Sequence, residues 1–164
     1  MTALHICNRD TGVKALHWQT SAFDDLGNRE LYAALRLRLE VFAVEQNSLY
    51  QDLDNLDQEA THMLAWEDGC LVAYQRCLAP GISYRESAIG RIVVAADARG
   101  RQLGRELVRR GIRHNLARWP GQGIRLNAQS YLRAFYQQLG FVAEGEDYRL
   151  DGIPHIEMVY AGSG

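Results

Sequence analysis

The sequence predicts a single α/β domain in which a mixed sheet carries helices on both faces. Apolar residues make up 47% of the 164 residues, which is enough to build one substantial core. Two segments repeat apolar residues at the spacing of an amphipathic helix, and apolar runs of strand length lie around them. The second helical segment stands between two strand candidates, and such a crossover places its two strands side by side in parallel.

The first third of the chain predicts one strand and one long helix. We expect the strand at residues 15–20 and the start of the helix at Asn28, a residue type favoured at helix N-termini. An irregular polar run follows at residues 47–59. The buried face of the helix is predicted from apolar residues at helical spacing, which are Leu31, Leu35, Leu39 and Phe42.

The middle of the chain predicts a hairpin and the crossover unit. Two strand candidates, residues 62–66 and 71–78, are separated by a short turn. Residues 88–95 form an apolar run of the kind that is buried on both faces of a sheet. A helix is expected from residue 101, and Pro120 ends it. Its apolar side consists of Leu103, Leu107, Val108, Ile112 and Leu116.

The last part of the chain completes the sheet. Residues 123–128 are predicted to form the second strand of the crossover unit, and residues 131–139 a short helix. Gly140 is expected to end that helix in the left-handed conformation, which glycine adopts without steric cost. Two further strands are predicted at residues 141–144 and 156–160.

Charge and composition limit the classes of partner. The formal net charge of −2 gives no sign of a nucleic-acid partner. No apolar run approaches the length of a membrane span, and residues 1–14 lack the apolar stretch of a signal peptide, so we expect a cytoplasmic protein without a membrane partner. Residues 1–14 are expected to be disordered, and residues 15–160 to form the domain.

The acidic residues of the polar run do not predict a metal site. Asp52, Asp54, Asp57 and Glu59 lack the glycine and the ligand spacing of a calcium loop. The ordinary interpretation of such a run is a solvated loop, and the alternative is a cluster of carboxylates that attracts a cationic amine. No metal is expected elsewhere in the sequence.

The turn at residues 99–104 carries the strongest chemical signal. A buried strand opens here into a helix, whose first N–H groups lack partners and attract anions. Gly100 and Gly104 allow close approach of a ligand, while Arg99, Arg101 and Arg105 add positive charge. The pattern predicts a pyrophosphate cradle, and its alternative interpretation is a helix start without a ligand. Neither the Walker loop nor the dinucleotide fingerprint is present.

This segment resembles a known family motif. Residues 99–104 (RGRQLG) resemble the acyl-CoA motif [QR]-x-x-G-x-[GA] of the GNAT acetyltransferase superfamily, and residues 134–141 (AFYQQLGF) are similar to its fourth helix and following strand. A closer likeness to the ElaA-like branch lies in four segments: 41–47 (VFAVEQN), 50–54 (YQDLD), 127–129 (NAQ) and 151–156 (DGIPHI). Gln102 replaces the middle glycine of the motif, and Gln129 replaces a common asparagine.

The resemblance implies a fold and a set of cofactor contacts. The fold is a mostly antiparallel sheet with a central parallel strand pair and helices on both faces. The co-substrate is acetyl-CoA, whose pantetheine arm would pair with the backbone of one strand like an added strand. The implied contacts are Ile92, Val93, Val94, Arg99, Gly100, Arg101, Gln102, Leu103, Gly104, Arg105, Gln129, Phe135 and Tyr136.

Acetyl transfer to an amine also needs groups that move protons. Tyr136 matches the superfamily tyrosine that protonates the departing thiolate, and a phenol with a pKa of ~10 is protonated at neutral pH. An amine with a pKa of ~10.4 must first lose a proton, which implies a base. Glu45 is the first candidate for the base and for acceptor binding, and His62 and His155 are the alternatives because imidazole titrates nearest neutrality.

The sequence therefore favours an acetyl-CoA-dependent N-acetyltransferase that acts on a small-molecule or peptide amine. The alternative is a non-catalytic acyl-CoA-binding domain, which would keep the cradle but need neither Tyr136 nor a base. A domain that retains the fold alone and binds a partner is a third interpretation, which Gln102 favours. The resemblance also implies a homodimer.

Overall fold

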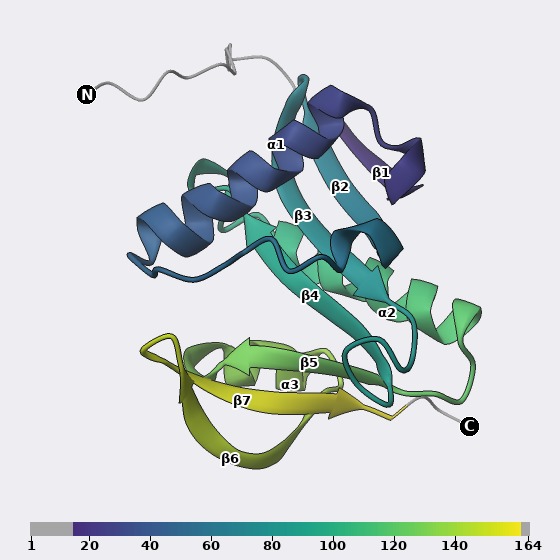
Figure 1. Ribbon diagram of the computed structural model, residues 1–164, viewed down its shortest axis with the longest axis vertical. Helices are drawn as coiled ribbons and strands as arrows, with labels where there is room; N and C mark the ends of the chain where they lie inside the picture. The colour runs from purple at the N-terminus through teal and green to yellow at the C-terminus, as the bar shows by residue number, and fades with distance from the viewer. Residues whose placement is uncertain (1–14, 162–164) are drawn as a thin grey trace.

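The computed structural model describes residues 15–161, and the expectation for residues 1–14 lies outside this range. Seven strands form one sheet in the order β1-β2-β3-β4-β5-β7-β6 (Figure 1). The strands are β1 (Leu16–Ala22), β2 (Thr61–Glu67), β3 (Cys70–Leu78), β4 (Ser87–Val94), β5 (Ile124–Gln129), β6 (Val142–Leu150) and β7 (Ile153–Tyr160). The helices are α1 (Asn28–Leu39), α2 (Leu103–Arg118) and α3 (Arg133–Gln138).

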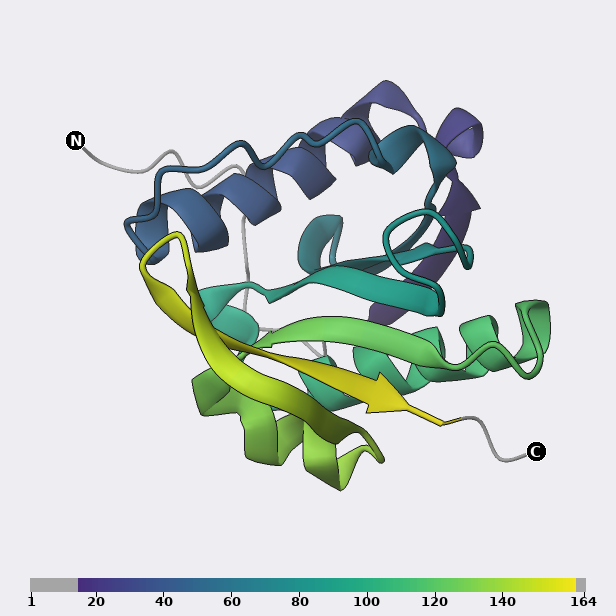
Figure 2. The same cartoon turned by 60° about the horizontal axis from the view of Figure 1, so that its bottom comes forward.

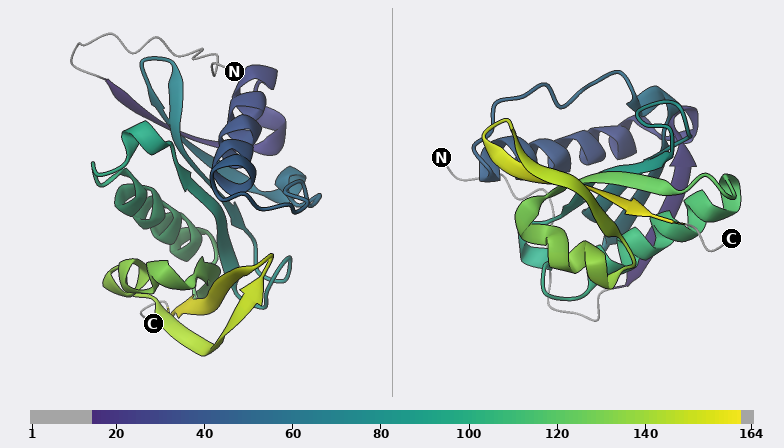
Figure 3. Two further views of the ribbon diagram at one scale, coloured as in Figure 1. Left: turned by 90° about the vertical axis from the view of Figure 1, so that its left-hand side faces the viewer. Right: turned by 90° about the horizontal axis from the view of Figure 1, so that it is seen from below.

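Helices cover both faces of the sheet, as predicted. Helix α1 lies on one face, and α2 and α3 lie on the other (Figure 2 and Figure 3, left). Under α2 and α3, the larger buried cluster includes Leu107, Val108 and Ile124. Under α1, a second cluster includes Leu37 and Tyr74. No helix within residues 15–161 has both the length and the apolar composition needed to cross a membrane.

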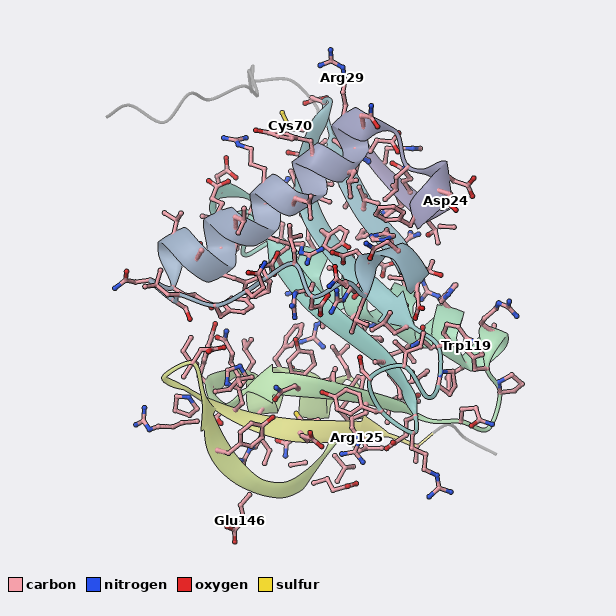
Figure 4. The ribbon with its side chains drawn as sticks, in the orientation of Figure 1. Asp24, Arg29, Cys70, Trp119, Arg125 and Glu146 are labelled. Carbon is pink, nitrogen blue, oxygen red and sulfur yellow. The ribbon has the colours of Figure 1, made fainter. Side chains whose placement is uncertain are left out.

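The parallel strands β4 and β5 are paired at one end and apart at the other. Their register joins Ser87 to Ile124 and Ala88 to Arg125, and no later residues of the two strands pair. Arg125, labelled in Figure 4, holds this closed end through ion pairs with Glu86 at 2.7 Å and Glu157 at 2.6 Å. The remainder of β4 therefore has a free edge that faces β5.

The predicted buried face of α1 is partly wrong. The buried residues of the helix are Ala34, Leu37 and Arg38, whereas Leu39 is 46% exposed. The face is displaced because it includes a charged residue, Arg38, that is fully buried among ionic partners. A search for an apolar stripe cannot recognise such a face.

The last two strands are longer than predicted. β6 extends to Leu150 and β7 begins at Ile153, beyond the predicted residues 141–144 and 156–160. The register of the pair shifts between Glu144 and Tyr148, next to Gly145 with φ of +80°. β6 forms the edge of the sheet and is largely exposed, so its sequence lacks the apolar alternation by which strands are recognised.

Candidate active site

A groove of about 610 Å³ runs along the turn that the sequence singles out. Its floor includes the first residues of α2, where Gln102 is the N-cap and makes no side-chain capping bond. The N–H of Glu106 bonds to the carbonyl of Gln102, so the preceding N–H groups of Leu103, Gly104 and Arg105 have no partner within the helix. These donors suit an anion such as a pyrophosphate.

Gln102 has a backbone conformation that glycine adopts without steric cost. Its φ is +65°, in the left-handed region, and Gly100 has a φ of +79°. The left-handed conformation therefore places strain on Gln102, which carries a side chain. A Cβ atom at Gly104 would lie 3.6 Å from Val94 Cγ2 and 3.8 Å from Phe135 Cζ, which leaves room for a methyl group but not for a long side chain.

The three arginines of the turn have different partners. Arg99 lines the groove and forms a bidentate ion pair with Glu45, with N–O distances of 2.5 and 2.9 Å. Arg105 lines it too, with its guanidinium 5.9 Å from the centre of the Phe135 ring. Arg101 is not among the lining residues, and its side chain pairs with Glu67 at 2.8 Å.

The walls of the groove come from β4 and α3. Ile92, Val93 and Val94 line it on the β4 side, and Phe135 and Tyr136 line it on the α3 side. The N–H of Ala95 bonds to Val72 of β3 at 2.8 Å. Because successive N–H groups of a strand point to opposite sides, the N–H of Val94 points toward the separated strand β5.

A second cavity of about 320 Å³ lies beyond the groove. Polar side chains from distant parts of the chain line it: Gln46, Ser48, Tyr50, Asp54, Arg76, Ser83, Tyr84, Arg91, Asn127, Gln129, Asp151 and His155. Arg76 and Arg91 were not predicted as site residues, because nothing in their local sequence signals a site. Asn127 lies in a segment that carries the family resemblance, but no role was predicted for it.

An ionic cluster supports one wall of this cavity. Arg38 pairs with Asp52 at 3.0 Å and with Asp57 at 2.8 Å, and Arg76 pairs with Asp54 at 2.5 Å and with Asp57 at 2.9 Å. Asp52 and Asp57 are 4% and 5% exposed, so the expectation of a solvated loop is wrong. The acidic run is buried because arginines from α1 and β3 neutralise it.

The groove and the cavity meet at five shared residues, which are Phe42, Gln46, Ile92, Gln129 and Tyr136. Tyr136 is 5% exposed, and burial raises the pKa of its phenol well above the usual value. Its hydroxyl is therefore protonated at neutral pH. Gln46 and Gln129 exchange two side-chain hydrogen bonds, at 3.0 and 3.3 Å.

The structure separates the three candidate bases. His155 lines the cavity, and its Nδ1 donates to the carbonyl of Ile153 at 2.7 Å, so in the neutral ring Nε2 carries the lone pair. Glu45 lines the groove, and its hydrogen bond with Arg99 lowers the pKa of its carboxyl. His62 is fully buried and lines neither space.

The ring of His62 has partners at both nitrogens. Nε2 donates to the carbonyl of Asp57 at 2.8 Å, and Nδ1 accepts from the hydroxyl of Tyr74 at 2.7 Å. Burial lowers the pKa of the ring. Because both ring nitrogens are hydrogen-bonded within the core, His62 has a structural role. Within residues 15–161, no group of His, Cys, Asp and Glu side chains is arranged to hold a metal ion.

Comparisons with known proteins agree with this geometry. Residues 23–161 match the family described as Acetyltransferase (GNAT) domain. Protein ElaA of Escherichia coli K12 is 39% identical over 145 residues, which are 87% of this chain and 95% of that protein. The crystal structure of E. coli ElaA has a TM-score of 0.84 at 38% identity, covering 89% of this chain and 99% of that one.

A second solved structure has the same degree of likeness. It is described as an acyl-CoA N-acyltransferase from Pseudomonas aeruginosa, and its TM-score is 0.85 at 43% identity. The match covers 90% of this chain and 100% of that chain. The likeness therefore extends over the strands, helices and turn that form both the groove and the cavity.

Proposed function

Because the chain belongs to the GNAT acetyltransferase family, in its ElaA-like branch, we propose that it is an N-acetyltransferase that moves an acetyl group from acetyl-CoA directly to an amine. The observation that carries the proposal is the meeting of a donor-rich groove and a polar cavity at Tyr136. Such an arrangement brings two substrates together at one proton donor.

The groove fits the chemistry of acetyl-CoA, which supplies the acetyl group as an activated thioester. The open N–H groups of Leu103, Gly104 and Arg105 would hold the pyrophosphate, with Arg99 and Arg105 adding charge. The N–H of Val94, on the free edge of β4, offers a donor to the pantetheine arm or the thioester oxygen.

Tyr136 is the proposed general acid. As the sulfur leaves, its negative charge requires a proton, and the buried phenol of Tyr136 is a protonated donor at the junction. In the proposed reaction the carbon–sulfur bond breaks, the carbon–nitrogen bond forms and the sulfur takes the proton of Tyr136. The phenolate then recovers a proton from solvent.

His155 is the proposed general base, in preference to Glu45. His155 lines the cavity that would hold the amine, and Nε2 is the ring nitrogen left with a lone pair, whereas the carboxylate of Glu45 is bound to Arg99 in the groove. A carboxylate stabilised by an arginine is a weak base. His155 would accept the proton that the amine nitrogen loses as it attacks.

The test combines calorimetric titration of acetyl-CoA with a CoA-release assay over a panel of amines. Tyr136→Phe is expected to lower kcat by about 100-fold and to leave the Kd for acetyl-CoA within about threefold. Tyr131→Phe is the matched control, because Tyr131 also lines the groove but is 75% exposed. His155→Gln is expected to lower kcat by about 100-fold as well.

A second function is distinguished by the same assay. A non-catalytic acyl-CoA-binding domain would bind acetyl-CoA in the groove but release no CoA with any amine. Tight binding without turnover would therefore favour that alternative, and the absence of binding would contradict both functions.

A further inference from the structure

The hydrogen-bonded pair Gln46–Gln129 lies where the groove and the cavity meet. Each glutamine donates its Nε2 to the other's Oε1, at 3.3 Å from Gln46 and 3.0 Å from Gln129. Both side chains are partly buried, and both line the groove and the cavity. The pair is therefore part of the boundary between the two spaces.

The two glutamines come from opposite sides of the separated strands. Gln46 follows the π-helical turn (Glu40–Glu45) that continues α1, which packs on β3 and β4. Gln129 is the last residue of β5, and the two residues are 83 positions apart in the sequence. The ends of α1 and β5 lie on the same side of the molecule in Figures 1 and 2. The bridge thus spans the two parts of the sheet at their open end.

We propose that the Gln46–Gln129 bridge limits the length of the acyl group that the protein accepts. The inference rests on the proposed function, in which the thioester lies at the junction beside Tyr136. The other shared residues there, Phe42 and Ile92, are apolar walls that offer an acyl chain no polar partner. An acetyl group ends at this point, whereas a longer chain must continue toward the cavity and meets the bridge.

The chemistry of the bridge makes it a selective barrier. An acyl chain presents C–H groups alone beyond its carbonyl, so it cannot replace either amide hydrogen bond. Displacing the bridge would leave two partly buried amides without partners, which is unfavourable. Because both groups are neutral, no ion pair fixes the bridge, and we expect discrimination of about tenfold rather than complete exclusion.

Binding of acyl-CoA esters by calorimetry tests this inference without requiring turnover. Wild-type protein is expected to bind acetyl-CoA about tenfold more tightly than hexanoyl-CoA. In Gln129→Ala and in Gln46→Ala the ratio is expected to fall to about threefold or less, because the surviving glutamine has no partner in the bridge. Gln129→Asn, one methylene shorter, is expected to behave as Gln129→Ala.

Two controls identify the cause. Gln122→Ala, at an exposed position outside both spaces, is expected to keep the wild-type ratio. A double variant of Gln46 and Gln129 to alanine is expected to differ little from either single variant, since each alone removes the bridge. The ratio of kcat/KM for the same two esters should change in parallel with the Kd ratio.

The outcomes separate the two proposals. A wild-type protein that binds hexanoyl-CoA as tightly as acetyl-CoA would overturn the inference, and so would an unchanged ratio in all bridge variants that bind acetyl-CoA normally. A wild-type protein that binds no CoA ester would overturn the proposed function, and this inference with it.

Discussion

The groove and the cavity are built in different ways. The groove takes its donors from the backbone of one continuous segment, β4, the turn and the start of α2, and its ion pair Glu45–Arg99 is about 40% exposed. The cavity wall depends on side-chain charges of α1, β3, β4 and the acidic loop, several of which are buried. Added side-chain volume should therefore weaken acetyl-CoA binding in the groove, whereas loss of a charge in the cavity wall should lower the free energy of unfolding.

The largest expected effect is on the cavity side, from Asp57→Asn. One carboxylate oxygen of Asp57 accepts bonds from both Arg38 and Arg76. Burial opposes the ionised form, yet the hydrogen bonds and charges of these arginines hold the pKa of Asp57 below its usual range. Removing the charge leaves buried arginines with too few partners, so we expect a loss of about 3–5 kcal/mol in the free energy of unfolding, measured with urea.

A surface ion pair provides the control for this variant. Glu106 pairs with Arg110 on α2, and both side chains are more than one third exposed. Glu106→Gln removes the same charge but is expected to cost less than about 1 kcal/mol. If Asp57→Asn were as mild, the buried cluster would not be a source of stability.

The next largest effect is expected on the groove side, from Gly104→Glu. A Cβ atom there already contacts Val94 and Phe135, so a longer side chain must enter the groove and bring a negative charge to the anion donors. We expect the Kd for acetyl-CoA to rise by at least about 100-fold, with a folded protein by circular dichroism. Gly104→Ala is the control, and it should bind within about threefold of wild type. An equal rise in the Kd for acetyl-CoA in both variants would contradict this interpretation of the groove.

The same contrast explains what the sequence could predict. The strand, the turn and the helix start of the groove are consecutive, and their apolar run, glycines and arginines are visible as a pattern. The bridge joins residues 83 positions apart, and Asp52 and Asp57 look solvated until Arg38 and Arg76 reach them from other elements. Arg38 itself interrupts the apolar stripe of α1. Pairing between distant charges is a tertiary property, so a local pattern could not predict it.

A pH titration of the wild type tests the cavity side, because His62 contacts the ionic cluster at the carbonyl of Asp57. Burial lowers the pKa of His62, and its Nδ1 already accepts a hydrogen bond from the hydroxyl of Tyr74. The neutral ring therefore contributes stability above its unfolded pKa of ~6.5, and this stability is lost as the pH falls. Below pH ~6.5 the free energy of unfolding should fall by up to about 1.4 kcal/mol per pH unit for this histidine.

His62→Gln serves as the control for that titration, because glutamine keeps a donor toward the carbonyl of Asp57 and does not titrate. His114, whose pKa burial also lowers, contributes with the same sign in both proteins. The slope below pH ~6.5 should therefore be smaller in His62→Gln but not zero. Identical slopes would mean that His62 takes up its proton equally in the folded and unfolded states.

The smallest expected effect distinguishes two roles for Glu45. Among the described residues that line the groove, Glu45 is the acidic one, and it holds Arg99 beside the anion donors of α2. In Glu45→Gln this negative charge is gone and Arg99 is free to meet a phosphate. Since both side chains are well exposed, solvent screens the effect, and we expect the Kd for acetyl-CoA to fall by about two- to fivefold with kcat within about twofold of wild type.

Glu40→Gln, on the same π-helical turn but outside the groove, removes an equal charge and should leave the Kd unchanged. Added salt should reduce the gain in Glu45→Gln, because ionic screening weakens the repulsion that the variant relieves. If Glu45 were instead the general base, the variant would lose about 100-fold in kcat with an unchanged Kd. A lower Kd with retained kcat would mean that the negative charge of Glu45 weakens acetyl-CoA binding in the groove. The residue that deprotonates the amine would then be one that lines the cavity.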